Sequence, residues 1–183
     1  MLSDTSHPAA LYHLRKVTRI SALIIILLVV VGFFLPTDYR VERRIVINAP
    51  SHVVYDDMFK AEYLSKWMFI QGGQVDVFDG ALKEGDLVGL SYSETPDVGE
   101  LILIKLSDRL IRFDVRPKLK NNLVHNEIVL QPNGNSTFVK WTIKGNLSAG
   151  LLGPYLAFFA NDIAGENFEI SLRNLKEQIE DQK

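Results

Sequence analysis

Cysteine is absent from the 183-residue sequence. This absence excludes a disulfide framework, a thiolate nucleophile, an iron–sulfur cluster and any zinc site with sulfur ligands. The four histidines, His7, His13, His52 and His125, lack the spacing of metal ligands, so we expect no dedicated metal site. The formal net charge is only -2 at pH 7, which gives no reason to expect a nucleic acid partner.

Charge is also missing from one long run near the N-terminus. Ile20 to Leu35 reads ISALIIILLVVVGFFL, sixteen uncharged residues closed by Pro36. A signal peptide usually has an apolar stretch of about 7 to 15 residues and a small-x-small cleavage site, whereas this run ends in bulky residues. With two preceding residues it approaches the roughly 17 to 25 that span a bilayer. We predict a basic tail over residues 1–19 and an uncleaved transmembrane anchor over residues 20–36. The alternative, a buried core helix, would have to be apolar on every face.

Basic residues flank this run on both sides and leave its orientation open by count alone. They are Arg15, Lys16 and Arg19 before it, and Arg40, Arg43 and Arg44 after it. The second group falls in a strand of the folded domain, so the first group decides the expectation. We expect a single-pass membrane protein with a cytoplasmic N-terminus and an extracytoplasmic domain. A short linker, Thr37 to Tyr39, is expected to hold that domain close to the membrane surface.

The remaining residues, 39–181, predict one α+β domain. The segment VERRIVIN alternates as a half-buried strand, interrupted by Arg43 and Val46, and two short helices follow. Six further β-prone runs are separated by turn residues, which predicts an antiparallel meander. They are VDVF, LVGLSY, ELILIKL, LIRFDVR, LVHNEIVLQ and TFVKWTIKGNL.

The chain then predicts one long amphipathic helix from Pro154 to about Glu180, with an apolar stripe that includes Leu156 and Phe168. Gly165 beside this stripe indicates either ordinary packing or room left for something next to the helix. A curved sheet wrapped around such a helix can leave a cavity between them.

Both ends of the domain resemble a known superfamily. VERRIVINAPSHVVYDDMFKAEYLSKWM is similar to the opening of START-related SRPBCC proteins, and DIAGENFEISLRNLKEQIE resembles the closing helix of polyketide cyclase-like members. The resemblance covers roughly Tyr39 to Glu180. It implies a helix-grip fold whose hydrophobic pocket holds lipids, sterols, polyketides or other apolar molecules in the family. It supplies no shared catalytic set, and no cofactor is expected.

Several residues are candidates for lining that pocket. Asn126 falls on the apolar face of its strand and needs a hydrogen-bond partner, which a ligand, the backbone or a trapped water can supply. Trp141 shares a face with Val139 and Ile143, in core or pocket, while Tyr92 would offer a hydroxyl if it points inward. Trp67, Met68 and Phe69 lie at the expected mouth or in ordinary packing. The candidate set is Trp67, Tyr92, Phe113, Asn126, Trp141 and Phe168.

Three functions remain open at this point. The first is a membrane-anchored, non-enzymatic binding protein for a hydrophobic small molecule or lipid. The second is a cyclase or aromatase-like enzyme in the same pocket; its best acid–base pair, His125 and Glu127, shares a strand face but points outward by alternation. A solvated cross-strand cluster with Arg112 or Arg116 is the alternative for that pair. The third is a partner-binding scaffold whose cavity is filled by side chains.

Overall fold

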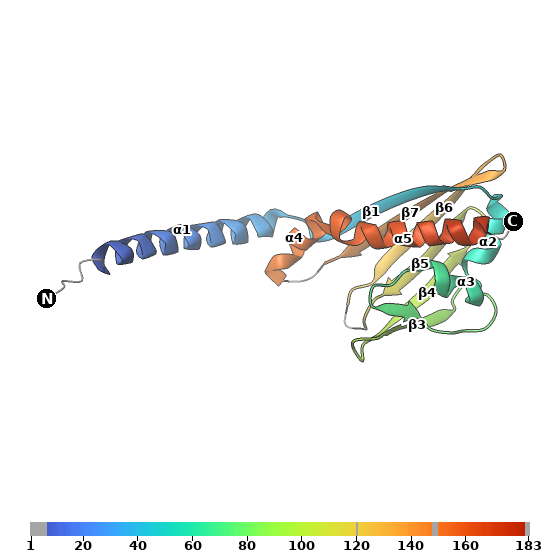
Figure 1. Cartoon of the computed structure of the whole chain (residues 1–183), viewed down its shortest axis with the longest axis horizontal. Helices are drawn as coiled ribbons and strands as arrows, with labels where there is room; N and C mark the ends of the chain where they lie inside the picture. Colours follow the sequence, from blue (N-terminus) through green and yellow to red (C-terminus); the bar gives the residue numbers. More distant parts are fainter. Residues whose placement is uncertain (1–6, 120, 148–149, 182–183) are drawn as a thin grey trace.

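A computed structural model describes residues 7–119, 121–147 and 150–181 as one long helix followed by a sheet-and-helix domain (Figure 1). The N-terminal helix α1 spans His7–Phe34. The elements of the domain are β1 Asp38–Ile47, α2 Ser51–Met58, α3 Ala61–Trp67, β2 Gly73–Val75, β3 Leu87–Tyr92, β4 Val98–Leu106, β5 Leu110–Arg116, β6 Val124–Asn133, β7 Ser136–Asn146, the 3-10 helix η1 Gly150–Leu152, α4 Gly153–Phe158 and α5 Ala160–Glu180.

The strands form one seven-stranded antiparallel sheet in the order β1-β7-β6-β5-β4-β3-β2. Strands β2 to β7 follow each other as neighbours, and β1 pairs along its whole length with the last strand, β7. The curled sheet leaves a concave side, which α5 covers along β1 (Figure 1). The predicted α+β, helix-grip architecture is confirmed.

Alternation along the strands gives the sheet two different faces. Ile111 and Phe113 of β5, and Val139, Trp141 and Ile143 of β7, are buried on the inner face. Arg112 and Lys140, which alternate with them, carry charge and lie on the outer face, as expected from the period of two in a strand. The main core therefore lies between the inner face, α2, α3 and α5.

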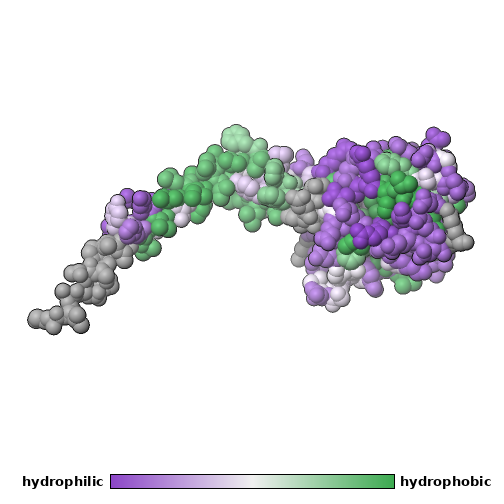
Figure 2. Space-filling view, turned by 45° about the horizontal axis from the view of Figure 1, so that its top comes forward, coloured by the Kyte–Doolittle hydropathy of each residue, from purple (hydrophilic) through white to green (hydrophobic). Residues whose placement is uncertain are grey.

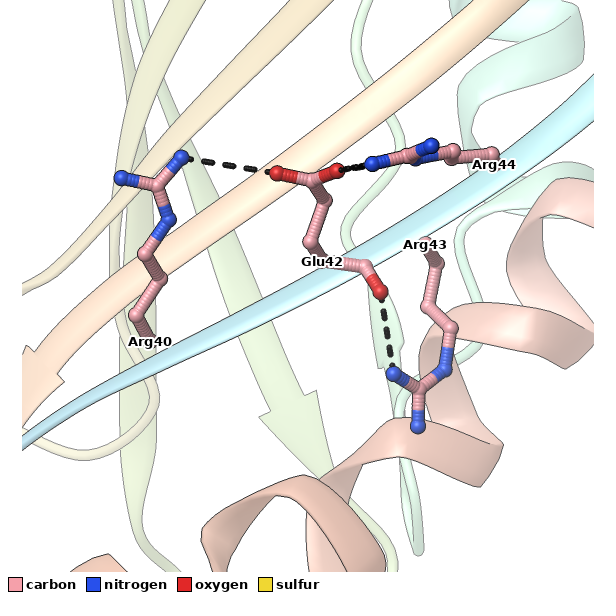
Figure 3. A network of polar contacts seen from close by, with 4 residues as sticks. All are labelled: Arg40, Glu42, Arg43 and Arg44. Atoms are coloured by element: carbon pink, nitrogen blue, oxygen red, sulfur yellow. Dashed lines mark hydrogen bonds and ion pairs between the residues drawn. The ribbon is translucent and has the colours of Figure 1, made fainter.

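Arg43 is a charged residue on the inner side of β1. Its Nη1 donates to the Glu42 carbonyl oxygen at 3.0 Å, and its Nε lies 2.7 Å from Glu169 Oε1 on α5. Figure 3 shows the Arg43 side chain lying against α5, while Arg40 and Arg44 approach the Glu42 carboxylate on the other side of the strand. A Cβ at Gly165 would lie 1.8 Å from Arg43 Nη2. The Arg43 guanidinium thus occupies the space beside Gly165, for which the sequence left ordinary packing and room beside the helix as alternatives.

The run VDVF is not the strand that the sequence predicts. Strand β2 ends at Val75, and the Val77 side chain is 98% exposed. Asp76 still donates its N–H to the Gly89 carbonyl at 2.9 Å, but its carboxylate lies where a Cβ of Gly89 would be. The pairing of β2 with β3 ends with this hydrogen bond, and the chain then leaves the sheet.

The predicted continuous C-terminal helix is wrong at its N-terminal end. It is divided at Phe159 into the short α4 and the long α5, and Leu156 is exposed instead of joining the apolar stripe. Phe159 has φ -91° and ψ 4°, which ends α4. α4 packs near α1, and the Tyr155 hydroxyl donates to the Leu28 carbonyl.

The predicted linker is also shorter than expected. Asp38 and Tyr39 belong to β1, where they pair with Asn146 and Gly145. Leu147 N–H donates to the Thr37 carbonyl at 2.9 Å, so backbone pairing begins almost directly after Pro36. The domain is therefore joined to α1 with little free chain between them.

One helix in the described part of the chain is long and apolar enough to cross a membrane, and it covers Leu11–Phe34. Its apolar side chains are exposed, so α1 is not part of the domain core. Figure 2 shows hydrophobic residues along most of α1, in contrast to the largely hydrophilic surface of the domain. Such a helix near an N-terminus fits a membrane span and a signal sequence alike.

Candidate ligand-binding pocket

A cavity of about 340 Å³ lies between the inner face of the sheet, the loop after α3 and the middle of α5. Most of the side chains around it are aliphatic or aromatic, and the polar ones are few. The lining residues are Tyr39, Met68, Phe69, Ile70, Gln71, Leu90, Tyr92, Phe113, Val115, Pro117, Lys118, Val124, Asn126, Trp141, Asn167 and Phe168.

Trp141 is the centre of the aromatic wall. Its ring centroid lies 6.0 Å from Phe113, 5.0 Å from Phe168 and 5.8 Å from Trp67. Most of these contacts are edge-on, the arrangement that aromatic rings prefer. Trp67 is completely buried behind this wall and donates its Nε1–H to the Met58 carbonyl at 2.6 Å. Trp67 therefore supports the wall without lining the cavity.

Asn126 contributes a polar group to the apolar wall. Its Nδ2 donates to the Val124 carbonyl at 3.0 Å, and its Oδ1 accepts from Trp141 Nε1 at 3.0 Å. The protein thus supplies hydrogen-bond partners for both the Nδ2 and the Oδ1 of this buried amide. No ligand is needed to satisfy it. The pair also fixes the orientation of the Trp141 ring.

Tyr92 and Lys118 form a polar corner of the cavity. The Tyr92 hydroxyl donates to the Pro117 carbonyl, and Lys118 Nζ lies 5.6 Å from the centre of the Tyr92 ring. Lys118 also pairs with Asp97 at 2.6 Å. Burial raises the pKa of Tyr92 above its ordinary value, and the nearby Lys118 cation partly opposes this rise. The tyrosine is therefore a neutral hydroxyl at physiological pH.

Tyr39 is a lining residue that the sequence does not indicate, because the strand alternation begins only after it. Its ring occupies the space above Gly145, where any Cβ would lie 2.5 Å from the Tyr39 hydroxyl oxygen. Burial raises the pKa of Tyr39. The signal in the sequence is Gly145, which lies opposite Tyr39. It can be recognised only once the pairing of β1 with β7 is known.

The loop after α3 forms the mouth of the cavity. Phe69 and Gln71 are exposed at its rim. Phe69 N–H donates to Ser171 Oγ at 3.0 Å, and Ser171 donates in turn to the Asn167 carbonyl at 2.9 Å. These bonds tie the mouth loop to α5. Phe69 is exposed at the mouth, whereas Met68 is buried.

The structure brings five of the six candidate residues together around this cavity and leaves Trp67 behind the wall. The five are Tyr92, Phe113, Asn126, Trp141 and Phe168. Their place in the lining is a matter of geometry, and their role in binding stays a prediction. Tyr39, Gln71, Lys118 and Asn167 are the polar lining residues absent from the sequence-based set.

The acid–base candidates lie on the opposite face of the sheet. His125 Nδ1 is 2.8 Å from Asp114 Oδ1, and Arg112 Nε is 2.8 Å from Glu127 Oε2. The His125 side chain is 61% exposed. These are cross-strand pairs on the solvent side, as the solvated-cluster interpretation predicts for Glu127 and Arg112. Within the described residues, no three His, Cys, Asp or Glu side chains are grouped to hold a metal ion.

The curled sheet, the long closing helix and the apolar cavity between them define the helix-grip class of proteins. No family model and no curated protein matches the chain. Solved structures do resemble it. Protein CV1439 from Chromobacterium violaceum has a TM-score of 0.62 at 17% identity, over 77% of this chain and 96% of that one.

Two other similar structures come from biosynthetic proteins. Norcoclaurine synthase from Thalictrum flavum, in complex with dopamine and hydroxybenzaldehyde, has a TM-score of 0.59 at 11% identity, covering 84% of this chain and 92% of that one. A putative protein of the dynemicin biosynthetic locus has a TM-score of 0.57 at 12% identity, covering 79% of this chain and 48% of that one. At such identities the likeness establishes the fold alone.

Proposed function

We propose that this protein is a membrane-anchored binding protein that holds a small apolar molecule in the cavity between the sheet and α5. The cavity carries the proposal: it is preformed, about 340 Å³ in volume and lined mainly by apolar side chains. Ligand pockets range over roughly 300 to 1,000 Å³ and combine an apolar lining with a few polar groups. The volume is at the low end of this range, which favours a compact molecule or part of one acyl chain over a whole two-chain lipid.

Apolar burial would supply most of the affinity, at roughly 25 cal/mol per Å² before the cost of ordering the ligand. The polar groups of the lining are suited to orientation. The Tyr92 hydroxyl donates inside the protein but its oxygen still has acceptor capacity, and Tyr39 lines the same space. A ligand with one polar end and an apolar body fits this arrangement.

Anchoring by α1 would place the cavity close to lipid. Tyr39 is five residues after Phe34, the last residue of α1, so at most about 18 Å of chain separates them. A ligand that partitions into the bilayer would be concentrated beside the binding site. We further propose that the N-terminus is cytoplasmic and the domain extracytoplasmic, on the basis of Arg15, Lys16 and Arg19 before the span.

A cyclase-like activity has less support from the site. Acid–base chemistry needs a titratable group within reach of the substrate. The described lining contains Tyr39, Tyr92 and Lys118 but no carboxylate or histidine, and Lys118 is paired with Asp97. The partner-binding scaffold with a filled cavity likewise has no observation in its favour at this site, because the space is open.

The test is saturable binding of an uncharged fluorescent probe, N-phenyl-1-naphthylamine, to the full chain in lipid nanodiscs. Val124→Trp would project a large ring from β6 into the cavity, since Val124 lines it. Val129→Trp is the matched control, because Val129 lies on the same strand but on the outer face and is absent from the lining. Empty nanodiscs report probe uptake by lipid.

We expect at least a tenfold weaker affinity for Val124→Trp and an unchanged affinity for Val129→Trp, with both variants folded by circular dichroism. Equal affinities for the two variants and the parent chain would place the probe outside this cavity. Absence of any saturable binding above empty nanodiscs, together with no apolar molecule in native mass spectra of the purified chain, would overturn the proposal.

A further inference from the structure

A second apolar surface lies next to α1, at η1 and α4. Leu151, Leu152, Phe158 and Phe159 are 60%, 67%, 72% and 51% exposed. The surrounding sequence has no charged residue and no histidine between Lys144 and Asp162. Large aliphatic and aromatic side chains concentrated on one short exposed segment indicate a surface that is covered in the working protein.

The same segment is attached to the apolar helix. The Tyr155 hydroxyl of α4 donates to the Leu28 carbonyl of α1. The Tyr155 ring also packs over Gly32, where a Cβ would lie 3.3 Å from its Cε2. Figure 1 shows α4 beside the C-terminal end of α1. These contacts fix the position of α4 along the axis of α1.

The residue of α1 that Tyr155 contacts, Leu28, lies within the apolar run. Leu28 lies six residues before Phe34, which is about 9 Å along a helix axis at 1.5 Å per residue. If the C-terminal end of α1 lies at the membrane surface, the Tyr155 hydroxyl lies up to about 9 Å below that surface. Tyrosine is enriched at membrane interfaces, and interfacial segments bury their apolar side chains about 5 to 10 Å deep.

The length of the apolar run points the same way. The helix long enough to cross a membrane is Leu11–Phe34, but its uncharged part, Ile20 to Phe34, rises only about 22 Å against the roughly 30 Å hydrocarbon core of a bilayer. A short span is accommodated by local thinning and by drawing its flanks inward. At the C-terminal flank the structure has uncharged η1 and α4 to meet the lipid, whereas Arg19 can only snorkel at the other end.

We propose that η1 and α4 form a second membrane contact that lies in the interfacial layer of the bilayer beside α1. The inference rests on the proposed anchoring of α1. Its occupant is lipid, because the surface is continuous with the side chains of the span and is bonded to it. The contact would hold α5, which begins directly after α4, and therefore the cavity, in a defined position above the membrane.

Single-cysteine labelling tests this directly, because the natural chain has no cysteine. Phe158→Cys, Phe33→Cys and Asn135→Cys, each labelled with an environment-sensitive fluorophore, report on α4, on the span and on the remote β6–β7 turn. All three side chains are exposed, so folding should tolerate the changes. Leu152→Cys in η1 is a second reporter. The full chains are placed in phosphatidylcholine vesicles that contain a lipid spin-labelled near the headgroup end of its acyl chain.

We expect the lipid probe to quench Phe158→Cys at least half as strongly as Phe33→Cys and not to quench Asn135→Cys. Iodide in the water should quench Asn135→Cys several-fold more than Phe158→Cys. A Phe158 label as open to iodide as the Asn135 label, with Phe33 in lipid, would overturn the interfacial contact alone. If the Phe33 label is also outside lipid, the anchoring itself fails. Protection from iodide without quenching by the lipid probe would put protein, such as a second copy, on this surface and would equally overturn the proposal.

Discussion

The two faces of the sheet are built from the same strands and do different things. On β6, Val124 and Asn126 face the cavity, whereas His125 and Glu127 alternate with them and face solvent. The inner face joins aromatic rings around Trp141 and uses one amide to orient them. The outer face carries charged side chains that pair across strands, such as His125 with Asp114 and Arg112 with Glu127. Reactive side chains are thus available in this sheet, but they are on the side away from the cavity.

The energetics of the two faces should differ as well. Burying an apolar side chain contributes about 1.5 to 3 kcal/mol, whereas an exposed ion pair contributes about 0 to 1 kcal/mol. The inner face should therefore contribute most of the free energy of unfolding. Truncation of an inner-face side chain to alanine should destabilise the protein far more than the same truncation of its outer-face neighbour.

The largest effect is expected at Trp141, which is 2% exposed and contacts three aromatic rings. Trp141→Ala should cost about 3 to 5 kcal/mol in the free energy of unfolding, because it removes the centre of the wall and leaves a void. Lys140→Ala, on the outer face of the same strand, should change it by no more than about 0.5 kcal/mol. Urea unfolding of both variants measures the difference. A loss below 1 kcal/mol for Trp141→Ala would mean that this wall does not stabilise the fold.

The next effect is expected at Asn126. Asn126→Ala leaves Trp141 Nε1–H without the acceptor that it has at 3.0 Å, so it should cost about 1 to 3 kcal/mol. Glu127→Ala, its neighbour on the outer face, breaks only the exposed pair with Arg112 and should cost under about 1 kcal/mol. Trp fluorescence should also shift in Asn126→Ala and not in Glu127→Ala. Similar losses for the two variants would contradict the separation of the faces.

A smaller effect on stability is expected near Arg43, the charged residue on the inner side of β1. The sign of this effect depends on whether Arg43 is present. Gly165→Ala should destabilise the parent chain, because the new Cβ would lie 1.8 Å from Arg43 Nη2. In an Arg43→Ala background the same change should stabilise by up to about 1 kcal/mol, through the higher helix propensity of alanine. A double-mutant cycle in urea measures the coupling. Equal effects in both backgrounds would show that the guanidinium does not occupy this space.

Periodicity predicted the faces of the strands but not which strands meet. The run LIRFDVR coincides with β5, Leu110–Arg116, and parity alone placed Asn126 inward and His125 outward. The partners of Asn126 depend on the β6–β7 register, which joins Asn126 to Ile143 and sets Trp141 beside it. No local pattern encodes that register, so the choice between a ligand and a protein partner stayed open.

Two misjudged segments have the same cause. The alternation starts after Tyr39 and so predicts a linker there, but pairing with Gly145, far along the chain, extends β1 to include it. The break at Phe159 lies within a stripe that is helical throughout by spacing. At this break α4 contacts both β1 and α1, and the Tyr155 hydroxyl donates to the Leu28 carbonyl, so tertiary contacts outweigh local periodicity here.

The smallest effect is expected on the outer face at Glu42, whose carboxylate lies between Arg40 and Arg44 (Figure 3). The hydrogen bond from Arg44 is the main cause that lowers the pKa of Glu42 below its ordinary 4.5. The unfolded chain therefore takes up a proton at a pH where the folded one does not, so this contribution is present above about pH 4.5 and is lost as the pH falls through the folded-state pKa. Glu42→Gln should remove a small part of the acid destabilisation seen in urea titrations between neutral and acid pH. Because Glu42 and its two arginine partners lie on the solvent side of the strand, salt should reduce the difference between the two chains. A difference that survives high salt would mean that the outer face holds a less screened charge than its geometry indicates.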